Sequence, residues 1–265
     1  MIIDFHTHCF PDKLASRAIP QLSHASGGLA PCTDGTAAGL LSCMKQDGVQ
    51  ISVVQHIATT PHQQTSVNRF AAEINSEQLI SFGSIHPDAE NALDELDRIK
   101  ELGLKGVKFH PDYQQFYVDD AKMKPIYQKI SRLGLITLFH AGFDYGFPSP
   151  YHCMPKQMAK ALQWFDSPVV AAHWGGLCCG EEVIKYLCGL PLYFDLSYGY
   201  GTMPKATAQK IVERHGVKKL LFGSDCPWHR PSTEQRLIDS LELSESEQQD
   251  IFWNNAALLL GLSTI

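Results

Sequence analysis

The sequence predicts an α/β fold, a single (β/α)8 barrel that spans residues 1–265. Short apolar runs alternate with longer amphipathic stretches at intervals of roughly 25–30 residues, which is typical of βαβ units. The length of 265 residues is close to the roughly 250 residues of one such barrel. An open doubly wound sheet or two smaller domains also fit the length. No glycine-rich phosphate loop follows the first strand and no linker interrupts the chain, so the barrel is preferred.

Eight apolar runs are the expected strands. They should be parallel, because the helix between two strands returns the chain to the same end of the sheet. The runs lie at 2–6, 52–58, 80–86, 106–110, 135–140, 169–173, 192–196 and 220–223.

The clearest helix is expected at 88–102, where leucine and isoleucine recur at helical spacing. Asp88 is the expected N-terminal cap, and Gly103 the glycine that ends the helix. The last helix, which contains Ile251 and Leu260, is expected to pack against the outside of the barrel.

The connection 9–31 is the exception among these units. It lacks a good helical period and contains a Gly27-Gly28 pair. Long connections without regular structure are usually functional or disordered. Because this one follows the first strand, it should lie over the C-terminal mouth of the barrel, where we expect it to serve as a substrate lid.

Composition limits the partners. The net charge of −6 and the pI of about 6.0 argue against a nucleic-acid binder, so a small-molecule substrate is expected. No apolar run reaches the ~18 residues of a membrane span. Eight cysteines occur without a Cys-x-x-Cys pair, and no leader pattern precedes the first strand. The expectation is a cytoplasmic protein with reduced cysteines.

The first strand carries the first candidate site. Alternate residues of a strand share a face, so His6 and His8 should point the same way as Asp4. Ile3 and Phe5 should then face the helices. Two imidazoles at this spacing can bind one ion, but the pair is weak evidence when taken alone.

Three further strands end in side chains that bind metals, namely His140, His173 and Asp225. The C-terminal end of a barrel strand is the usual place for active-site residues. Histidine nitrogen with carboxylate oxygen suits Zn²⁺, and also Mn²⁺ or Fe²⁺. The alternative, a set of buried histidines held only by hydrogen bonds, is disfavoured because four separate strands contribute.

In this order the residues resemble the amidohydrolase superfamily. The finer motifs resemble its amidohydrolase-related branch, which includes aminocarboxymuconate semialdehyde decarboxylase, resorcylate decarboxylases and pyrone-dicarboxylate hydrolase. These motifs are Asp4-Phe5-His6-Thr7-His8, Gly106-Val107-Lys108-Phe109-His110-Pro111, His173-Trp174-Gly175-Gly176 and Gly223-Ser224-Asp225-Cys226-Pro227. The resemblance covers nearly the whole chain.

The resemblance implies that one divalent metal ion is bound by His6, His8, His140 and Asp225. It makes His173 an acid–base group or a further ligand. Lys108 lies on the strand where two-metal members carry a carbamylated lysine, and it is interpreted here as an unmodified polar residue. The resemblance also allows a homodimer.

Other residues are candidates for substrate contact. Arg17, Arg69 and Arg230 could each bind a substrate carboxylate as a bidentate fork. Arg230 is the preferred candidate because it lies in the loop just after Asp225, whereas a solvated helix surface is the preferred interpretation for Arg69. Trp174, like Trp228, could form a wall of the pocket or pack in the core. Lys108 and His110 share the inward face of the fourth strand.

The leading hypothesis is metal-dependent hydrolysis of a small carbonyl compound, a lactone or an amide bearing a carboxylate. The ion would lower the pKa of its bound water towards about 7, and Asp225 would act as the base. The alternative is non-oxidative decarboxylation of an aromatic or unsaturated carboxylic acid. A non-catalytic metal-binding barrel is a remote third hypothesis, because a protein that had lost its activity would be expected to lose at least one ligand.

Overall fold

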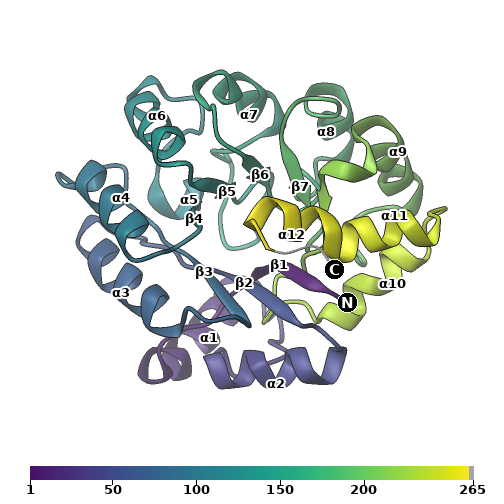
Figure 1. The fold of residues 1–265 in the computed structure, drawn as a ribbon, viewed down its shortest axis with the longest axis horizontal. Helices are drawn as coiled ribbons and strands as arrows, with labels where there is room; N and C mark the ends of the chain where they lie inside the picture. The colour runs from purple at the N-terminus through teal and green to yellow at the C-terminus, as the bar shows by residue number, and fades with distance from the viewer. Residues whose placement is uncertain (263–265) are drawn as a thin grey trace.

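A computed structural model describes residues 1–262 of the chain. Eight strands form at the positions that the apolar runs predict, and each pairs in parallel with the next within its sheet. Figure 1 shows them at the centre of the molecule with helices around them. The strands are β1 (Ile3–Thr7), β2 (Ile51–Gln55), β3 (Leu79–Phe82), β4 (Gly106–Phe109), β5 (Ile136–Phe139), β6 (Val169–Ala171), β7 (Tyr193–Asp195) and β8 (Leu220–Leu221).

The strands close into a barrel. β1 to β3 form one parallel sheet and β4 to β8 another. A bridge from Gly83 to Val107 joins β3 to β4, and a bridge from Thr7 to Cys226 joins β1 to the end of β8. Because the first strand neighbours the last, the open doubly wound sheet is excluded and the predicted (β/α)8 barrel is confirmed. The expected domain runs to residue 265, and positions 263–265 lie outside the described residues.

Helices follow the strands around the barrel. Those of the barrel proper are α1 (Asp12–Ala25), α2 (Ala37–Asp47), α3 (Gln64–Ile74), α4 (Ala92–Glu101), α5 (Pro111–Gln114), α6 (Lys124–Leu133), α7 (Pro155–Ala161), α8 (Gly180–Tyr186), α9 (Lys205–His215) and α10 (Pro231–Asp239). The chain ends with α11 (Glu245–Gln249), a π-helical turn (Asp250–Asn254) and α12 (Asn255–Leu260). Short 3-10 turns occur at Pro61–Gln63, Ala121–Met123, Leu162–Trp164 and Val217–Lys219.

Alternation along the strands builds two apolar layers. Val107, Phe109 and Phe139 point outward and join the buried residues of the surrounding helices in the larger cluster. A second cluster contains Leu138 and Val170 and fills the inside of the barrel, with contributions from the strands and the C-terminal segment. The C-terminal ends of the strands therefore rest on a packed apolar interior.

The expected orientation of Ile3 and Phe5 is wrong. Both belong to the inner cluster and not to the layer under the helices. The pairing register of β1 shifts between Asp4 and Thr7, which interrupts the strict alternation of faces. The Phe5 carbonyl then accepts a hydrogen bond from the Gln55 side-chain amide at 3.0 Å instead of from a strand partner.

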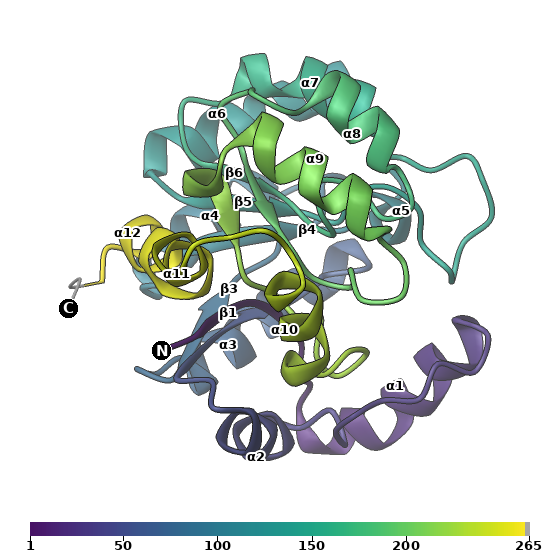
Figure 2. The same cartoon turned by 90° about the vertical axis from the view of Figure 1, so that its right-hand side faces the viewer.

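The last helix also differs from expectation. Ala256, Ala257 and Leu260 of α12 join the inner cluster together with Trp253. Figure 2 shows α12 at the end of the strands opposite to α1. The helix closes the N-terminal end of the barrel because the inner apolar residues there would otherwise be exposed to water.

Helix α4 begins later than expected. Its N-cap position is Asn91, and Asp88 lies outside it and pairs with Lys122 at 3.0 Å. The other end agrees with the sequence, because Gly103 has a positive φ of 73° just after the helix.

The segment 9–31 is largely helical, contrary to expectation. It contains α1, in which Ala15 and Ile19 are buried one turn apart. Pro20 lies inside this helix, and because proline is unfavourable in a helix interior, its presence argued against a helix in the sequence. The eight cysteines are all unpaired, as expected.

The free energy of unfolding should depend on pH through the protonation of His215 at the end of α9. Its Nε2 lies 3.0 Å from the Leu192 carbonyl, its Nδ1 accepts from the Gly189 N–H at 3.2 Å, and the ring stacks on Phe194. Burial lowers the pKa of His215 to about 4 although the Leu192 carbonyl opposes the shift. Since the unfolded chain binds the proton more tightly, stability is lost as pH falls from about 6.5 towards 4, by roughly 2 kcal/mol.

Urea unfolding of wild type and of His215→Gln measures this slope. The variant should lose the part of the slope that His215 contributes, whatever its absolute stability. His24→Gln, which changes an exposed histidine, should keep the wild-type slope. An unchanged slope in His215→Gln would assign the acid sensitivity to the other buried histidines.

Candidate metal centre

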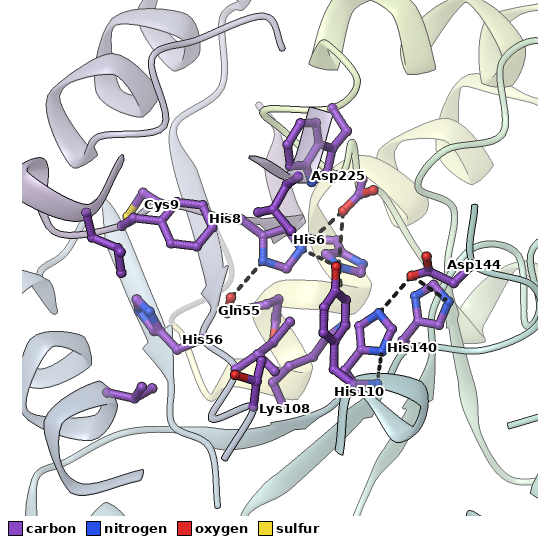
Figure 3. A pocket seen from close by; sticks show the side chains of 18 of the residues that line it. His6, His8, Cys9, Gln55, His56, Lys108, His110, His140, Asp144 and Asp225 are labelled. Atoms are coloured by element: carbon purple, nitrogen blue, oxygen red, sulfur yellow. Dashed lines mark hydrogen bonds and ion pairs between the residues drawn. The ribbon is translucent and has the colours of Figure 1, made fainter. Parts of the chain in front are cut away.

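A cavity of about 600 Å³ opens at the C-terminal ends of the strands. Polar side chains reach it from β1, β2 and β4 and from the segments after β5, β6 and β8, and Figure 3 shows several of them converging. The polar lining residues include His6, His8, Gln55, His56, Lys108, His110, His140, Asp144, His173 and Asp225. The position agrees with the rule that barrel enzymes place their sites at this end.

His6 and His8 each have one ring nitrogen fixed by an acceptor. His6 Nδ1 lies 2.9 Å from Asp195 Oδ2, and His8 Nδ1 donates to the Gln55 carbonyl at 2.8 Å. An acceptor at Nδ1 places the proton there and leaves the Nε2 lone pair free for a metal ion. The two Nε2 atoms face each other at 3.2 Å.

Asp225 completes a set of three donors. Its Oδ1 lies 3.1 Å from His8 Nε2 and 3.5 Å from His6 Nε2. Ligands about 2.0–2.1 Å from a tetrahedral zinc ion are separated by about 3.3 Å, so all three separations suit a single ion. His6, His8 and Asp225 therefore fit a divalent metal in both chemistry and spacing.

The pKa shifts of His6 and Asp225 also favour metal binding. Burial lowers the pKa of His6 well below its usual value, and the charge of Lys108 lowers it further. Burial alone would raise the pKa of Asp225, but the His8 hydrogen bond and the His6 ring leave it below the ordinary value. Neutral imidazoles and an ionised carboxylate are the forms that bind metals.

His140 lies beside this set and not within it. Its Nδ1 is 3.1 Å from His173 Nε2, and its Nε2 is 3.0 Å from the Phe143 carbonyl. The expected fourth ligand thus lines the cavity, next to the group of three donors. His173 in turn has its Nδ1 2.9 Å from Ser197 Oγ, and its backbone adopts a positive φ of 58°. Such conformations are concentrated at functional sites.

Lys108 lies at the centre of the cavity floor. Its Nζ is 3.2 Å from His6 Nε2, and only 1% of the residue is exposed. Burial lowers the pKa of Lys108 to about 8, although the Asp195 and Asp225 carboxylates oppose the shift.

A second donor group was missed in the sequence. Asp144 lies in the connection after β5. Its Oδ2 is 3.1 Å from His110 Nε2 and 3.8 Å from His140 Nε2. Burial alone would raise the pKa of Asp144, but the His110 hydrogen bond and the His140 ring hold it well below its usual range. Asp144 stands four residues after His140, and that spacing was the only signal available.

Three of the expected substrate contacts lie elsewhere. The Arg230 guanidinium forms a bidentate pair with the Asp47 carboxylate at 2.8–3.0 Å and does not line the cavity. Trp174 is fully buried and belongs to the core cluster. Arg17 is exposed on α1, outside the cavity lining. Lys108 and His110 do line the cavity, as expected.

Arg69 is exposed on α3, as expected, and it also borders the cavity, where the sequence favoured Arg230. It lines the cavity from α3, and within residues 1–262 its side chain forms no ion pair. His56, also in the lining, is buried, and its Nε2 has no hydrogen-bond partner in the described chain. Both groups are therefore available to a bound molecule.

The rest of the lining is apolar and aromatic. Helix α1 contributes Leu14 and Leu22, so the segment after His8 does lie over the mouth. The aromatic side chains of the lining are Phe10, Phe70, Tyr113, Tyr145, Tyr198 and Trp228. The cavity thus combines a polar floor with walls suited to a flat unsaturated molecule.

Residues 3–262 match the family model described as amidohydrolase. The chain therefore belongs to the amidohydrolase family, a family of metal-dependent barrel enzymes. A search of curated proteins finds no match. In the described part of the chain, no helix has both the length and the apolar character that crossing a membrane requires.

Solved structures share the fold at low identity. The 5-carboxyvanillate decarboxylase of Sphingomonas paucimobilis aligns with a TM-score of 0.72 at 16% identity, over 99% of both chains. A candidate 2-pyrone-4,6-dicarboxylic acid hydrolase of Pseudomonas putida gives 0.68 at 17% identity, over 100% of this chain and 98% of the other. A dihydroxybenzoic acid decarboxylase of Polaromonas sp. JS666, solved with manganese and 2-nitroresorcinol, gives 0.71 at 16%, over 100% and 98%.

Asp195→Asn should weaken metal binding by roughly 10–100-fold, the usual effect of removing a carboxylate behind a ligating histidine. The amide can present an N–H to His6 and so favour the wrong tautomer. Competition against a chromophoric chelator measures the affinity for Zn²⁺ and Mn²⁺. Asp250→Asn changes a carboxylate that pairs with Lys218 outside the cavity, and it should leave the affinity unchanged. Equal affinities for both variants would show that Asp195 does not orient His6.

Proposed function

We propose that the protein is a metal-dependent enzyme that removes a carboxyl group from a small aromatic or unsaturated carboxylic acid. The observation that carries this proposal is the cavity itself, in which aromatic walls enclose a buried set of metal donors. Two of the three solved structures named above are decarboxylases of aromatic acids, which supports the same substrate class. Hydrolysis, which the sequence favoured, becomes the second candidate.

His6, His8 and Asp225 would hold the ion, with His140 or a substrate oxygen in the remaining position. When bound, a divalent ion acts as a Lewis acid towards a substrate carboxylate or carbonyl oxygen and towards water. The apolar and aromatic part of the lining would shield a bound carboxylate from water, and desolvation of a carboxylate favours loss of carbon dioxide.

The carbon atom that loses carbon dioxide must receive a proton. The Asp225 carboxylate is ionised at neutral pH, so it can deliver a proton to that carbon only after it has taken one from solvent or from an acidic group of the substrate. His173 is the second acid–base group, and Ser197 Oγ holds its Nδ1 at 2.9 Å. Lys108 supplies positive charge at the cavity floor.

Arg69 would bind a further acidic group on the substrate. It is the one arginine among the residues that line the cavity in the described chain, and a guanidinium recognises a carboxylate in two-point fashion. Two of the solved structures named above have names that denote acids with a second acidic group, 5-carboxyvanillate and 2-pyrone-4,6-dicarboxylic acid.

Hydrolysis of a lactone or an amide stays a second candidate for one reason. Asp225 is ionised and lies beside the donor set, so the same carboxylate could take a proton from an attacking water. The segment containing α1 would cover the substrate in either reaction, because it borders the cavity directly after His8.

One screen separates the two candidates. Protein loaded with Zn²⁺ or Mn²⁺ is incubated with dihydroxybenzoic acids, 5-carboxyvanillate and 2-pyrone-4,6-dicarboxylic acid. Release of carbon dioxide, followed with a coupled assay, supports decarboxylation. Release of acid without carbon dioxide would replace that proposal with hydrolysis.

Asp225→Asn should lower kcat by at least roughly 100-fold, because an amide cannot carry the proton. Its free energy of unfolding should change far less, by about 1 kcal/mol, since the amide keeps the volume of the side chain. Rates on the substrate found above and urea unfolding measure the two effects. Asp239→Asn, on the exposed end of α10, is the matched control for the chemical change. Near-normal turnover across pH would transfer the role to His173.

Arg69→Ala should raise KM for a substrate with a second carboxylate by roughly 10–100-fold, which corresponds to one lost charge-assisted interaction. The kcat should change less, because Arg69 lies in a wall of the cavity and not in the donor set. Arg17→Ala removes an exposed arginine of α1 and should leave both constants unchanged. A fall in kcat alone would argue against a binding role for Arg69.

A further inference from the structure

Three cysteines from three separate segments meet outside the cavity. Cys32 precedes α2, Cys43 lies within α2, and Cys226 directly follows Asp225 after β8. Their sulfur atoms all lie within 4.8 Å of one another. None of the three lines the cavity, so they form a separate group of soft donors.

The simplest explanation for a buried cysteine is packing, because a thiol behaves as a small apolar side chain. Cys43 and Cys226 do belong to an apolar cluster with Leu40 and Val54. Packing alone does not explain why three thiols converge from positions up to 194 residues apart. The cysteines elsewhere in the chain form no comparable group of three in the described residues.

The spacing of the sulfur atoms is that of metal ligands. Cys32 Sγ and Cys226 Sγ are 3.8 Å apart. A tetrahedral zinc ion with Zn–S bonds of about 2.3 Å separates two sulfurs by about 3.8 Å, and three-coordinate copper(I) gives a similar value. A disulfide would require about 2.05 Å, so the pair is set for an ion between the sulfurs and not for a bond.

Backbone hydrogen bonds hold the segments that carry Cys32 and Cys226 in place without a metal ion. The Cys32 N–H donates to the Pro227 carbonyl at 2.7 Å, and the Cys226 N–H donates to Ser224 Oγ at 3.0 Å. The Cys32 thiol itself donates to the His229 carbonyl at 3.6 Å, which ties this cysteine to the segment after Cys226. Independently of the thiols, the pair between Arg230 and Asp47 holds α2 against the same segment.

We propose that Cys32, Cys43 and Cys226 bind one soft metal ion, Zn²⁺ or Cu⁺, at a site distinct from the histidine–aspartate centre. Thiolates select these ions over Mg²⁺, Ca²⁺ and Mn²⁺. Binding releases the thiol protons to solvent and involves no oxidation. The ion would join α2 and the segment before it to the loop that carries Asp225, and so would hold that ligand of the centre in place.

Cadmium titration of the reduced, metal-free protein tests the proposal. A cadmium ion bound to thiolates absorbs in the ultraviolet, whereas one bound only to histidine and carboxylate does not. We expect the band to grow to one sulfur-bound ion per chain and to disappear in Cys43→Ser. Cys188→Ser, which changes a half-buried cysteine outside the group, should keep the full band. No band in the wild type, or a full band in Cys43→Ser, would overturn the site.

A second measurement needs no variant and guards against misfolding of Cys43→Ser. Wild-type protein is alkylated with and without Zn²⁺ or Cu⁺ under reducing conditions, and each cysteine is quantified by mass spectrometry. The metal should protect Cys32, Cys43 and Cys226 together, while the exposed Cys178 reacts in both samples. Competition with a zinc or a copper(I) chelator then identifies the preferred ion. Independent reactivity of the three thiols, unchanged by either metal, would disprove the proposal.

Discussion

The seam between β1 and β8 is the constraint on which the rest of the structure depends. At this seam the Asp225 N–H donates to the His6 carbonyl at 2.8 Å, and the His8 N–H donates to the Cys226 carbonyl at 2.6 Å. These bonds close the barrel. They also bring the side chains at the end of β1 close to those that follow β8. Because backbone bonds fix the distance between strands, the donor atoms of His6, His8 and Asp225 meet without depending on flexible loops.

The same seam links the two groups of metal donors. Asp225 faces the cavity, while the next residue, Cys226, lies in the apolar cluster below α2. A positive φ of 70° at Asp225 allows the chain to turn sharply there and to present consecutive residues to different surroundings. An ion on the thiols would therefore act on the centre through the backbone, without any contact with the substrate.

The buried polar groups behind His6 and His173 satisfy one another in a directed way. Asp195 accepts from His6 on one side and binds the His173 and Ser197 N–H groups on the other. Such a network orients each imidazole, because every ring nitrogen that faces an acceptor must carry the proton. Without these partners the polar groups would be costly to bury. The apolar interior below, closed by α12, supplies the stability on which the network depends.

The sequence by itself determined the eight strands, the barrel and the residues at the strand ends, because strand periodicity and strand-end position are local properties. It predicted that His6, His8 and Asp225 lie together, and the structure brings their donor atoms within 4.8 Å of one another. Only the tertiary structure decided that Arg230 is engaged by Asp47 and that Arg69 faces the cavity, since pairing between distant residues leaves no local pattern. Likewise the register shift in β1, which turned Phe5 inward, depends on strand pairing that a sequence pattern cannot express. The convergence of three cysteines under α2 has the same origin: it is set by the closure of the barrel and not by spacing along the chain.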